Sequence, residues 1–220
     1  MTTQSNDDLT SRLENCYTGA VFDVLRANGY PKQVLPREIK ALLPEQRLAG
    51  PIFTVQGESR TDIGEHESLL EWTRMLTKAP SGHVVICQPN DDVVAHMGEL
   101  SSETFIYRGV RGYIVDGGAR DTDFISKIGF QVFSKYTTPM DVVGRWLPTE
   151  YNQPITIGGV VINGGDYVLA DRDGVVIIPG DIVEDIVSKV EVCMNTENKV
   201  RTAILDGMAP DEAYLKYGKF

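Results

Sequence analysis

The stretch HMGELSSETFIYRGVRGYIVDGGARDTDFI, residues 96–125, indicates the fold because helical and extended patterns alternate along it. Residues 100–109 predict a helix. The apolar run within residues 110–118 predicts a strand, and residues 122–130 predict a further helical turn. This alternation of helix and strand is typical of α/β proteins.

The segments on either side extend the alternation and add an antiparallel region. The predicted elements are a helix over 13–30 that ends near Gly29, a buried strand over 47–58, a helix over 65–82 that Pro80 and Gly82 stop, short extended segments over 83–88 and 93–98, a strand over 131–137, hairpins over 154–180 and a helix over 181–207. A looser stretch precedes the hairpins, whose Gly-Gly and Asp-Gly turns separate β-branched runs. The order predicts one mixed α/β domain over residues 1–220, a sheet sandwich covered by helices.

Composition excludes several classes of function. The 220 residues are 42% hydrophobic and carry 21 Lys and Arg against 31 Asp and Glu, which gives a net charge of −10. An acidic surface without a basic cluster repels phosphate backbones, so we expect no nucleic-acid partner. No apolar run approaches the roughly 20 residues of a membrane span. Three cysteines without CxxC spacing and a polar N-terminus predict a cytoplasmic protein with reduced thiols.

The segment that begins at Gly98 could hold an anion. Gly98 permits a turn just before the predicted helix, and the first amides of a helix lack partners and carry the positive end of its dipole. The candidate donors to a bound carboxylate or phosphate are the amides of Leu100, Ser101 and Ser102. Alternatively, Ser101 or Ser102 caps the helix and Glu103 interacts with its dipole.

A second candidate loop follows the strand within residues 110–118. Gly117 and Gly118 allow close approach of the backbone to a ligand, and Arg120 offers a planar fork that matches a carboxylate. Asp121 offers oxygen ligands that suit Mg²⁺ or Mn²⁺. Alternatively, Asp121 caps the next helical turn and Arg120 is a solvated charge. The absence of a third glycine after Gly117-Gly118 argues against a nucleotide site.

Together the two loops, residues 96–125, resemble the central signature of the RraA-like family. That family includes class II pyruvate aldolases acting on 4-hydroxy-4-methyl-2-oxoglutarate and 4-carboxy-4-hydroxy-2-oxoadipate. The resemblance extends over YTGAVFDVLRANG (17–29), LAGPIFTVQ (48–56), ITIGGVVINGGDYVLADRDGVVIIP (155–179) and ENKVRTAILDG (197–207). It implies a ββα sandwich of the swivelling-domain type, assembled as a trimer or a hexamer with sites between subunits.

The resemblance also implies roles for individual residues. Asp121 matches the carboxylate that binds Mg²⁺ or Mn²⁺ directly, and Arg120 matches the residue that binds the pyruvate end of the substrate. Glu99 matches an acidic residue that holds metal-bound water, and the amides after Gly98 match the cradle for the substrate carboxylate. Glu197 is similar to an acidic residue that a neighbouring subunit supplies to the outer shell of the metal.

The function that this resemblance implies is a metal-dependent lyase. It would release pyruvate from a 2-oxo acid by retro-aldol cleavage or by oxaloacetate decarboxylation, with a metal-bound water oriented by Glu99 as the base. The alternative is a protein-binding regulator of ribonuclease activity on the same fold. Many relatives carry an acidic residue three positions beyond the metal-binding aspartate, where this chain has Phe124, and this difference bears on the choice of substrate.

Other polar residues have simpler interpretations. We expect His96 to be a packed or surface histidine rather than a proton donor, and His66 to lie in a solvated first turn. The Asp173-Gly174 pair that follows Asp171 indicates a hairpin turn rather than paired catalytic carboxylates. Arg145 could reach a distal carboxylate of the substrate, but a surface ion pair is the expectation.

Overall fold

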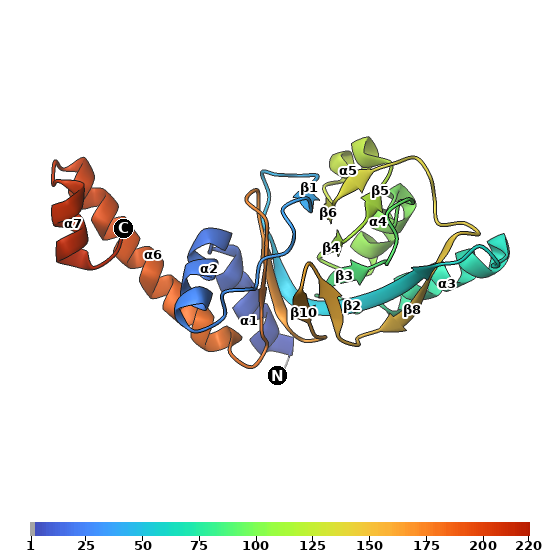
Figure 1. Cartoon of the computed structure of the whole chain (residues 1–220), viewed down its shortest axis with the longest axis horizontal. Helices are drawn as coiled ribbons and strands as arrows, with labels where there is room; N and C mark the ends of the chain where they lie inside the picture. Colours follow the sequence, from blue (N-terminus) through green and yellow to red (C-terminus); the bar gives the residue numbers. More distant parts are fainter. Residues whose placement is uncertain (1–2) are drawn as a thin grey trace.

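The computed structural model describes residues 3–220, so the first two residues of the predicted domain lie outside it. Its elements, in chain order, are α1 (Thr3–Glu14), α2 (Thr18–Ala27), β1 (Lys40–Ala41), β2 (Leu48–Ser59), α3 (Glu65–Lys78), β3 (Val84–Gln88), α4 (Glu99–Tyr107), β4 (Gly112–Val115), β5 (Gly118–Ala119), α5 (Thr122–Ile128), β6 (Gln131–Ser134), β7 (Tyr136–Thr137), β8 (Trp146–Tyr151), β9 (Ile155–Ile157), β10 (Val160–Ile162), β11 (Tyr167–Ala170), β12 (Val175–Ile178), α6 (Val183–Leu205) and α7 (Pro210–Tyr217). In Figure 1 α5 lies above the strands, α4 lies beside β5 and α3 lies at the right, whereas α1, α2 and α6 lie to the left of the strands.

The main sheet of the described chain is mixed, with the strand order β1-β6-β4-β3-β2-β11-β12. Strands β2, β3, β4 and β6 run parallel, and the outer strands join antiparallel. The edge of β2 away from β3 pairs with β11 over 48–51 and with β8 over 55–59. The mixed α/β class is therefore confirmed, and the hairpins β9–β10 and β11–β12 are antiparallel as predicted.

Helices α1, α2 and α6 pack together against β11 and β12, in an apolar cluster that includes Leu13, Leu169 and Val187. The ion pair between Arg12 Nε of α1 and Glu191 Oε1 of α6, at 2.8 Å, joins the two helices. The second half of α6 extends away from the sheet, and α7 lies beside it (Figure 1). No helix in the described part of the chain, α6 included, is long and apolar enough to cross a membrane.

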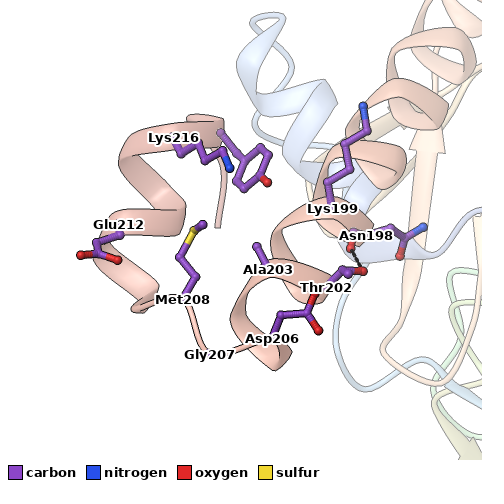
Figure 2. A pocket seen from close by; sticks show the side chains of 10 residues that line it. Asn198, Lys199, Thr202, Ala203, Asp206, Gly207, Met208, Glu212 and Lys216 are labelled. Atoms are coloured by element: carbon purple, nitrogen blue, oxygen red, sulfur yellow. Dashed lines mark hydrogen bonds between the residues drawn. The ribbon is translucent and has the colours of Figure 1, made fainter.

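An open hollow of about 740 Å³ separates α6 from α7 (Figure 2). Its charged side chains are exposed: Lys199 and Asp206 belong to α6 and its end, and Glu212 and Lys216 to α7. Both signs of charge are present around it, and each of these side chains is exposed to solvent. The hollow therefore offers no concentrated charge that would select a ligand.

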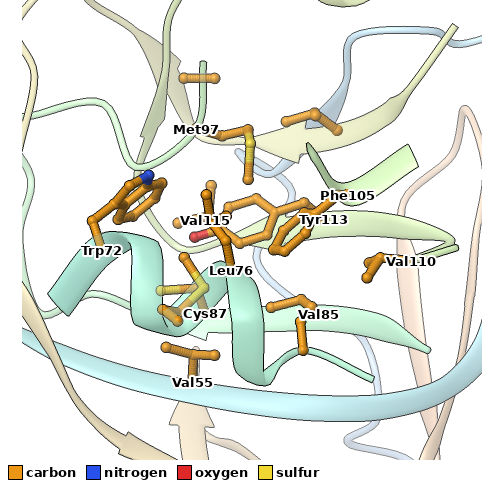
Figure 3. Packing of buried hydrophobic residues seen from close by; sticks show 14 of the residues in the cluster. Val55, Trp72, Leu76, Val85, Cys87, Met97, Phe105, Val110, Tyr113 and Val115 are labelled. Atoms are coloured by element: carbon orange, nitrogen blue, oxygen red, sulfur yellow. The ribbon is translucent and has the colours of Figure 1, made fainter. Parts of the chain in front are cut away.

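The two faces of the parallel strands bury different side chains, because neighbouring residues of a strand point to opposite faces. In β3, Val84 and Ile86 pack toward the hairpin β9–β10, in a cluster that contains Ile155. Val85 and Cys87 pack toward α3 and α4, in the cluster that Figure 3 shows. The hairpin, the sheet and the helices thus form three layers, and this arrangement confirms the predicted ββα sandwich.

The prediction of one continuous helix over 13–30 is wrong. Helix α1 ends at Glu14 and α2 begins at Thr18, because Tyr17 adopts an extended backbone with φ −130° and ψ 154°. The amide and hydroxyl of Thr18 donate to the Asp171 carboxylate at 2.9 and 2.7 Å. Asp171 lies in the turn of the hairpin β11–β12, so a distant segment supplies the acceptor at the start of α2.

Strand β8 corrects the prediction of a looser stretch before the hairpins. It pairs antiparallel with β2, and its first residue, Trp146, is fully buried. The Trp146 indole donates from Nε1 to the Pro89 carbonyl at 2.8 Å, which satisfies the only polar atom of that side chain. Helix α7 and the two-residue strand β1 were also not predicted from the sequence.

Candidate functional site

The two predicted loops lie side by side because their backbones are hydrogen-bonded. The amide of His96 donates to the Gly118 carbonyl and the amide of Arg120 donates to the Met97 carbonyl, both at 2.8 Å. This pairing carries Gly98 toward Asp121, although the two residues are separated by helix α4 and strand β4. Together with part of α3 and the segment 141–143, the loops enclose a cavity of about 330 Å³. Six predicted site residues line it: Gly98, Glu99, Leu100, Ser101, Arg120 and Asp121.

Asp121 occupies the position just before α5 but does not cap that helix with its side chain. Its backbone is left-handed, with φ 55° and ψ 33°. Its carboxylate Oδ2 instead accepts the amide of Glu99 at 3.2 Å. The ordinary capping interpretation is therefore wrong for this carboxylate. A non-glycine residue in this region costs about 1–3 kcal/mol, and such conformations gather at functional sites.

Arg120 lies between two carboxylates. Its Nε is 3.6 Å from Asp121 Oδ2, and its Nη1 is 3.4 Å from Asp141 Oδ2. The side chain remains partly exposed to the cavity, and the guanidinium is therefore held in place without being covered. Arg145 forms a surface ion pair with Asp141 Oδ1 at 3.6 Å, as expected, and it does not belong to the lining of the cavity.

Asp141 is the residue of this cavity that the sequence did not reveal. It lines the cavity and orients Arg120, but it lies in an irregular segment without periodicity or a recognisable motif. Its contribution depends on a contact between residues that are 21 positions apart. Only the folded chain brings the two together, so no local signal could have identified it.

The start of α4 presents free amides to the cavity. Gly98 precedes the helix, the Glu99 amide is bonded to Asp121, and the Ser102 amide donates to the Gly98 carbonyl at 3.0 Å. Of the predicted cradle, only the amides of Leu100 and Ser101 have no acceptor among residues 3–220. The structure therefore limits the free donors of this helix start to those two amides, which lie at the positive end of the helix dipole.

Neither serine caps α4, contrary to the alternative drawn from the sequence. The Ser102 hydroxyl donates back to the Gly98 carbonyl at 2.9 Å, and this side chain is buried. The Ser101 hydroxyl accepts the indole N–H of Trp72 at 3.0 Å. Ser101 therefore belongs to the cavity, whereas Ser102 supports the backbone behind it.

The donor set fits a divalent cation of the magnesium type. Mg²⁺ is commonly bound through one or two carboxylates and keeps several waters. Asp121 and Glu99 both line the cavity, and no cluster of three His, Cys, Asp or Glu side chains in the described chain forms a complete cage. A Cβ atom at Gly98 would lie 2.8 Å from Asp121 Oδ2, so the glycine keeps the space beside this carboxylate open.

Glu197 does not reach this cavity within its own chain. It lies on α6, which Figure 1 shows on the opposite side of the sheet from α4 and α5. Its carboxylate accepts the Tyr17 hydroxyl and lies 3.3 Å from Lys219 Nζ and 3.5 Å from Cys193 Sγ. Burial alone would raise the pKa of Glu197, but these hydrogen bonds outweigh burial and hold it below its usual value.

His96 is a packed histidine, as expected. Its side chain is fully buried, its ring meets Trp146 edge to face, and its Nε2 is 3.5 Å from Asp91 Oδ1. Burial lowers the pKa of His96 to about 4, against a weaker opposite effect of Asp91. The ring is therefore neutral near pH 7, and it does not line the cavity. His66 is exposed in the first turn of α3, also as expected.

Comparison with known proteins identifies the family. The family model described as "RraA-like: Aldolase/RraA" matches residues 18–177. Protein DlpA of Legionella pneumophila is 28% identical over 211 residues, or 96% of this chain, which spans only 34% of the length of DlpA. A Halalkalibacterium halodurans protein named "Putative 4-hydroxy-4-methyl-2-oxoglutarate aldolase" is 29% identical over 182 residues, with 83% of both chains covered.

Solved structures share the fold. Streptomyces coelicolor RraAS2, described as an unusual member of the RNase ES inhibitor RraA family, has a TM-score of 0.79 at 25% identity, with 89% of this chain and 97% of that one covered. A structure described as one of novel cellulases from gut-associated microbes has a TM-score of 0.84 at 34% identity, with 90% and 89% covered. The family model spans most of the chain and includes both loops of the cavity. The chain therefore belongs to the RraA-like family.

Proposed function

We propose that this chain is a divalent-metal-dependent lyase that releases pyruvate from a 2-oxo acid. The reaction would be retro-aldol cleavage of the 4-hydroxy-4-methyl-2-oxoglutarate type, with oxaloacetate decarboxylation as a related activity. The observation that carries the proposal is the meeting of Arg120, Asp121 and the free amides of α4 in one cavity. Family membership supports an aldolase-type or RraA-type function, and the name of the H. halodurans relative supports the aldolase.

The chain's own residues account for recognition of the 2-oxo acid. The amides of Leu100 and Ser101 can donate to one oxygen of the carboxylate, and the Arg120 guanidinium can bind the other. Asp141 and Asp121 hold Arg120 in position for this contact. The substrate carboxylate would thus neutralise a guanidinium that is already oriented, which reduces the entropy lost on binding.

Asp121 would hold Mg²⁺ or Mn²⁺ directly, and Glu99 would contact its outer shell through water. The bound cation would supply Lewis-acid stabilisation of the negative charge that develops on the pyruvate fragment. Glu99 lines the cavity and can orient a water that accepts the proton of the C4 hydroxyl. No lysine lines the described cavity, so the residues present do not favour Schiff-base chemistry.

The test is a coupled pyruvate assay with oxaloacetate and 4-hydroxy-4-methyl-2-oxoglutarate, with Mg²⁺ or Mn²⁺ and then with EDTA. We expect EDTA to abolish turnover, and Asp121→Asn to lower kcat/KM by about 100-fold or more, since it removes the charge that holds the cation. Asp123→Asn is the matched control, because Asp123 is exposed on α5 and lies outside the cavity lining. Blanks with metal and oxaloacetate alone correct for spontaneous decarboxylation.

Activity of Asp121→Asn equal to that of the control would contradict the role of Asp121. Calorimetric titration with Mn²⁺ separates loss of the metal from loss of catalysis, because only Asp121→Asn should weaken Mn²⁺ binding. The second candidate is a protein-binding regulator, which the description of RraAS2 favours. Absence of pyruvate from every oxo acid tested would support that candidate instead.

A further inference from the structure

The cavity has one polar end and one apolar wall. Arg120, Asp121 and the start of α4 form the polar end. The wall comes from Leu69, Trp72 and Leu76, which share one face of α3 because they are three or four positions apart. Met97, Val142 and Val143 complete the wall. A substrate anchored by its carboxylate at the polar end must place its other end against these side chains.

Trp72 contributes only apolar surface to this wall. Its single polar atom, Nε1, already donates to the Ser101 hydroxyl at 3.0 Å. Its indole otherwise packs with the buried cluster beneath, and Figure 3 shows it next to Leu76 and Met97 at the edge of that cluster. The indole is thus fixed by a hydrogen bond on one side and by packing on the other. This fixed position gives the wall a defined shape.

The charges of the lining disfavour a second carboxylate on the substrate. Among the described lining residues, Arg120 is the only cation, whereas Glu99, Asp121 and Asp141 are acidic. Arg120 is shared between two of these acids and the first carboxylate. A second carboxylate at the apolar wall would lose water without gaining a cationic partner, and such burial is costly.

We propose that the substrate is a 4-hydroxy-2-oxo acid whose C4 carries an uncharged alkyl or aryl group, and this inference rests on the proposed lyase function. In the cleavage, the C3–C4 bond breaks and the C4 hydroxyl gives its proton to the base. C4 becomes the carbonyl of an aldehyde or ketone. The electron pair remains on C3, which takes up a proton to give pyruvate, so no oxidant or reductant is needed. The cavity, at about 330 Å³, is near the lower end of the range of ligand pockets, about 300–1,000 Å³.

The first test compares 4-hydroxy-4-methyl-2-oxoglutarate with 4-hydroxy-4-methyl-2-oxohexanoate, in which an ethyl group replaces the distal carboxylate. We expect kcat/KM for the ethyl compound to be higher by at least about tenfold. A higher kcat/KM for the dicarboxylate, or equal values, overturns this inference and leaves the lyase in place. Absence of pyruvate from both contradicts the lyase itself, so the two failures are distinguishable.

The second test changes the wall. Leu69 is 45% exposed, so Leu69→Arg can place a cation there without disturbing the core. It should shift the ratio of the two kcat/KM values toward the dicarboxylate by about tenfold or more. Leu70→Arg is the matched control, because Leu70 is the next residue of α3, is 39% exposed and lies outside the lining. An equal shift in both variants would show a general effect of charge and overturn the assignment of the wall.

A binding measurement does not depend on turnover. The inert analogues 2-oxohexanoate and 2-oxoglutarate lack the C4 hydroxyl and can be titrated calorimetrically into the Mn²⁺-loaded protein. We expect 2-oxohexanoate to bind at least about tenfold more tightly, and Leu69→Arg to reduce or reverse this preference. Tighter binding of 2-oxoglutarate to the unmodified protein, or no difference between the two, overturns the inference.

Discussion

At residue 121, the direction of one carboxylate depends on an uncommon backbone conformation. With φ 55°, the side chain of Asp121 turns away from α5 and toward the start of α4, where it accepts the Glu99 amide. The backbone is held on the other side, because the Asp121 carbonyl accepts the amides of Phe124 and Ile125. Aspartate and asparagine tolerate the left-handed region better than most residues. Asp121 can therefore adopt the left-handed backbone, and this conformation places its carboxylate at the cavity.

His96 should make stability depend on pH. Its folded pKa of about 4 lies below its usual 6.5, so it contributes stability that is complete above pH 6.5 and is lost as pH falls toward 4. Between pH 7 and pH 5, the protein should lose about 2 kcal/mol of unfolding free energy through this group alone. Urea unfolding at several pH values measures the loss, and His96→Gln should remove it.

The control for this prediction is His66→Gln, because His66 is exposed at the start of α3. That variant should keep the pH dependence of the unmodified protein, since the exposed His66 side chain is not buried by folding as His96 is. Identical slopes for His96→Gln and the unmodified protein would contradict the assignment of the neutral buried ring. The comparison uses the slope of unfolding free energy against pH. The cost of packing the new glutamine amide is the same at every pH, so it does not change this slope.

At the scale of elements, local sequence patterns predicted most of the fold. Strand β3 and helices α3, α4 and α6 lie close to their predicted ranges, because each has its own hydrophobic period and its own terminating residues. The hairpins were also predicted from the local sequence, because their glycine-containing turns are local signals. The two loops of the cavity were also predicted. The chemistry of their residues left helix capping open as an alternative for the serines and Asp121, the family resemblance added the roles of Glu99 and Glu197, and all of these roles stay a proposal.

The elements that local sequence patterns did not predict depend on contacts between distant segments. The break before α2 is fixed by Asp171, which is 153 residues from Thr18. Strand β8 exists because β2 offers an unpaired edge and because Pro89 accepts the Trp146 indole. Asp141 likewise acquires its role through Arg120. Secondary-structure propensity and hydrophobic periodicity are local properties, so they do not reveal these contacts between distant segments.

The pairing of β2 with β8 requires glycine at position 57. A Cβ atom there would lie 2.0 Å from Cζ2 of Trp146 and 2.7 Å from the Leu147 carbonyl oxygen. Gly57→Ala should therefore lower the free energy of unfolding by about 2 kcal/mol, because the buried indole has no room to move. Gly19→Ala in α2 is the control: its Cβ would meet Tyr17 at an ordinary 3.5 Å, and helix propensity should raise stability by about 0.5–1 kcal/mol. Urea midpoints that fall equally for both variants would contradict the steric explanation.

At the scale of the whole molecule, α6 and α7 leave apolar side chains uncovered. Leu205 of α6, Leu215 of α7 and Phe220, which follows α7, are 79%, 80% and 75% exposed. Both helices extend away from the sheet (Figure 1). Large apolar side chains gathered on one part of a surface commonly mark an interface. This surface is consistent with the trimer or hexamer expected from the family resemblance, in which Glu197 of the same helix would serve a neighbouring site.

Assembly and activity should therefore fail together when this surface is charged. Leu205→Glu would place a carboxylate in an apolar contact without a partner, so it should dissociate a trimer or hexamer into monomers, as light scattering after size exclusion would show. If Glu197 completes a neighbouring site, the dissociated variant should also lose pyruvate release while keeping its helical circular dichroism.

The control is Thr202→Glu, which adds the same charge to an exposed position of α6. This position lies outside the apolar groove formed by Val200, Ile204, Leu205 and Phe220, so the variant should retain both its assembly and its pyruvate release. A monomeric unmodified protein with full activity would contradict the role of assembly, because each cavity would then act without a neighbour.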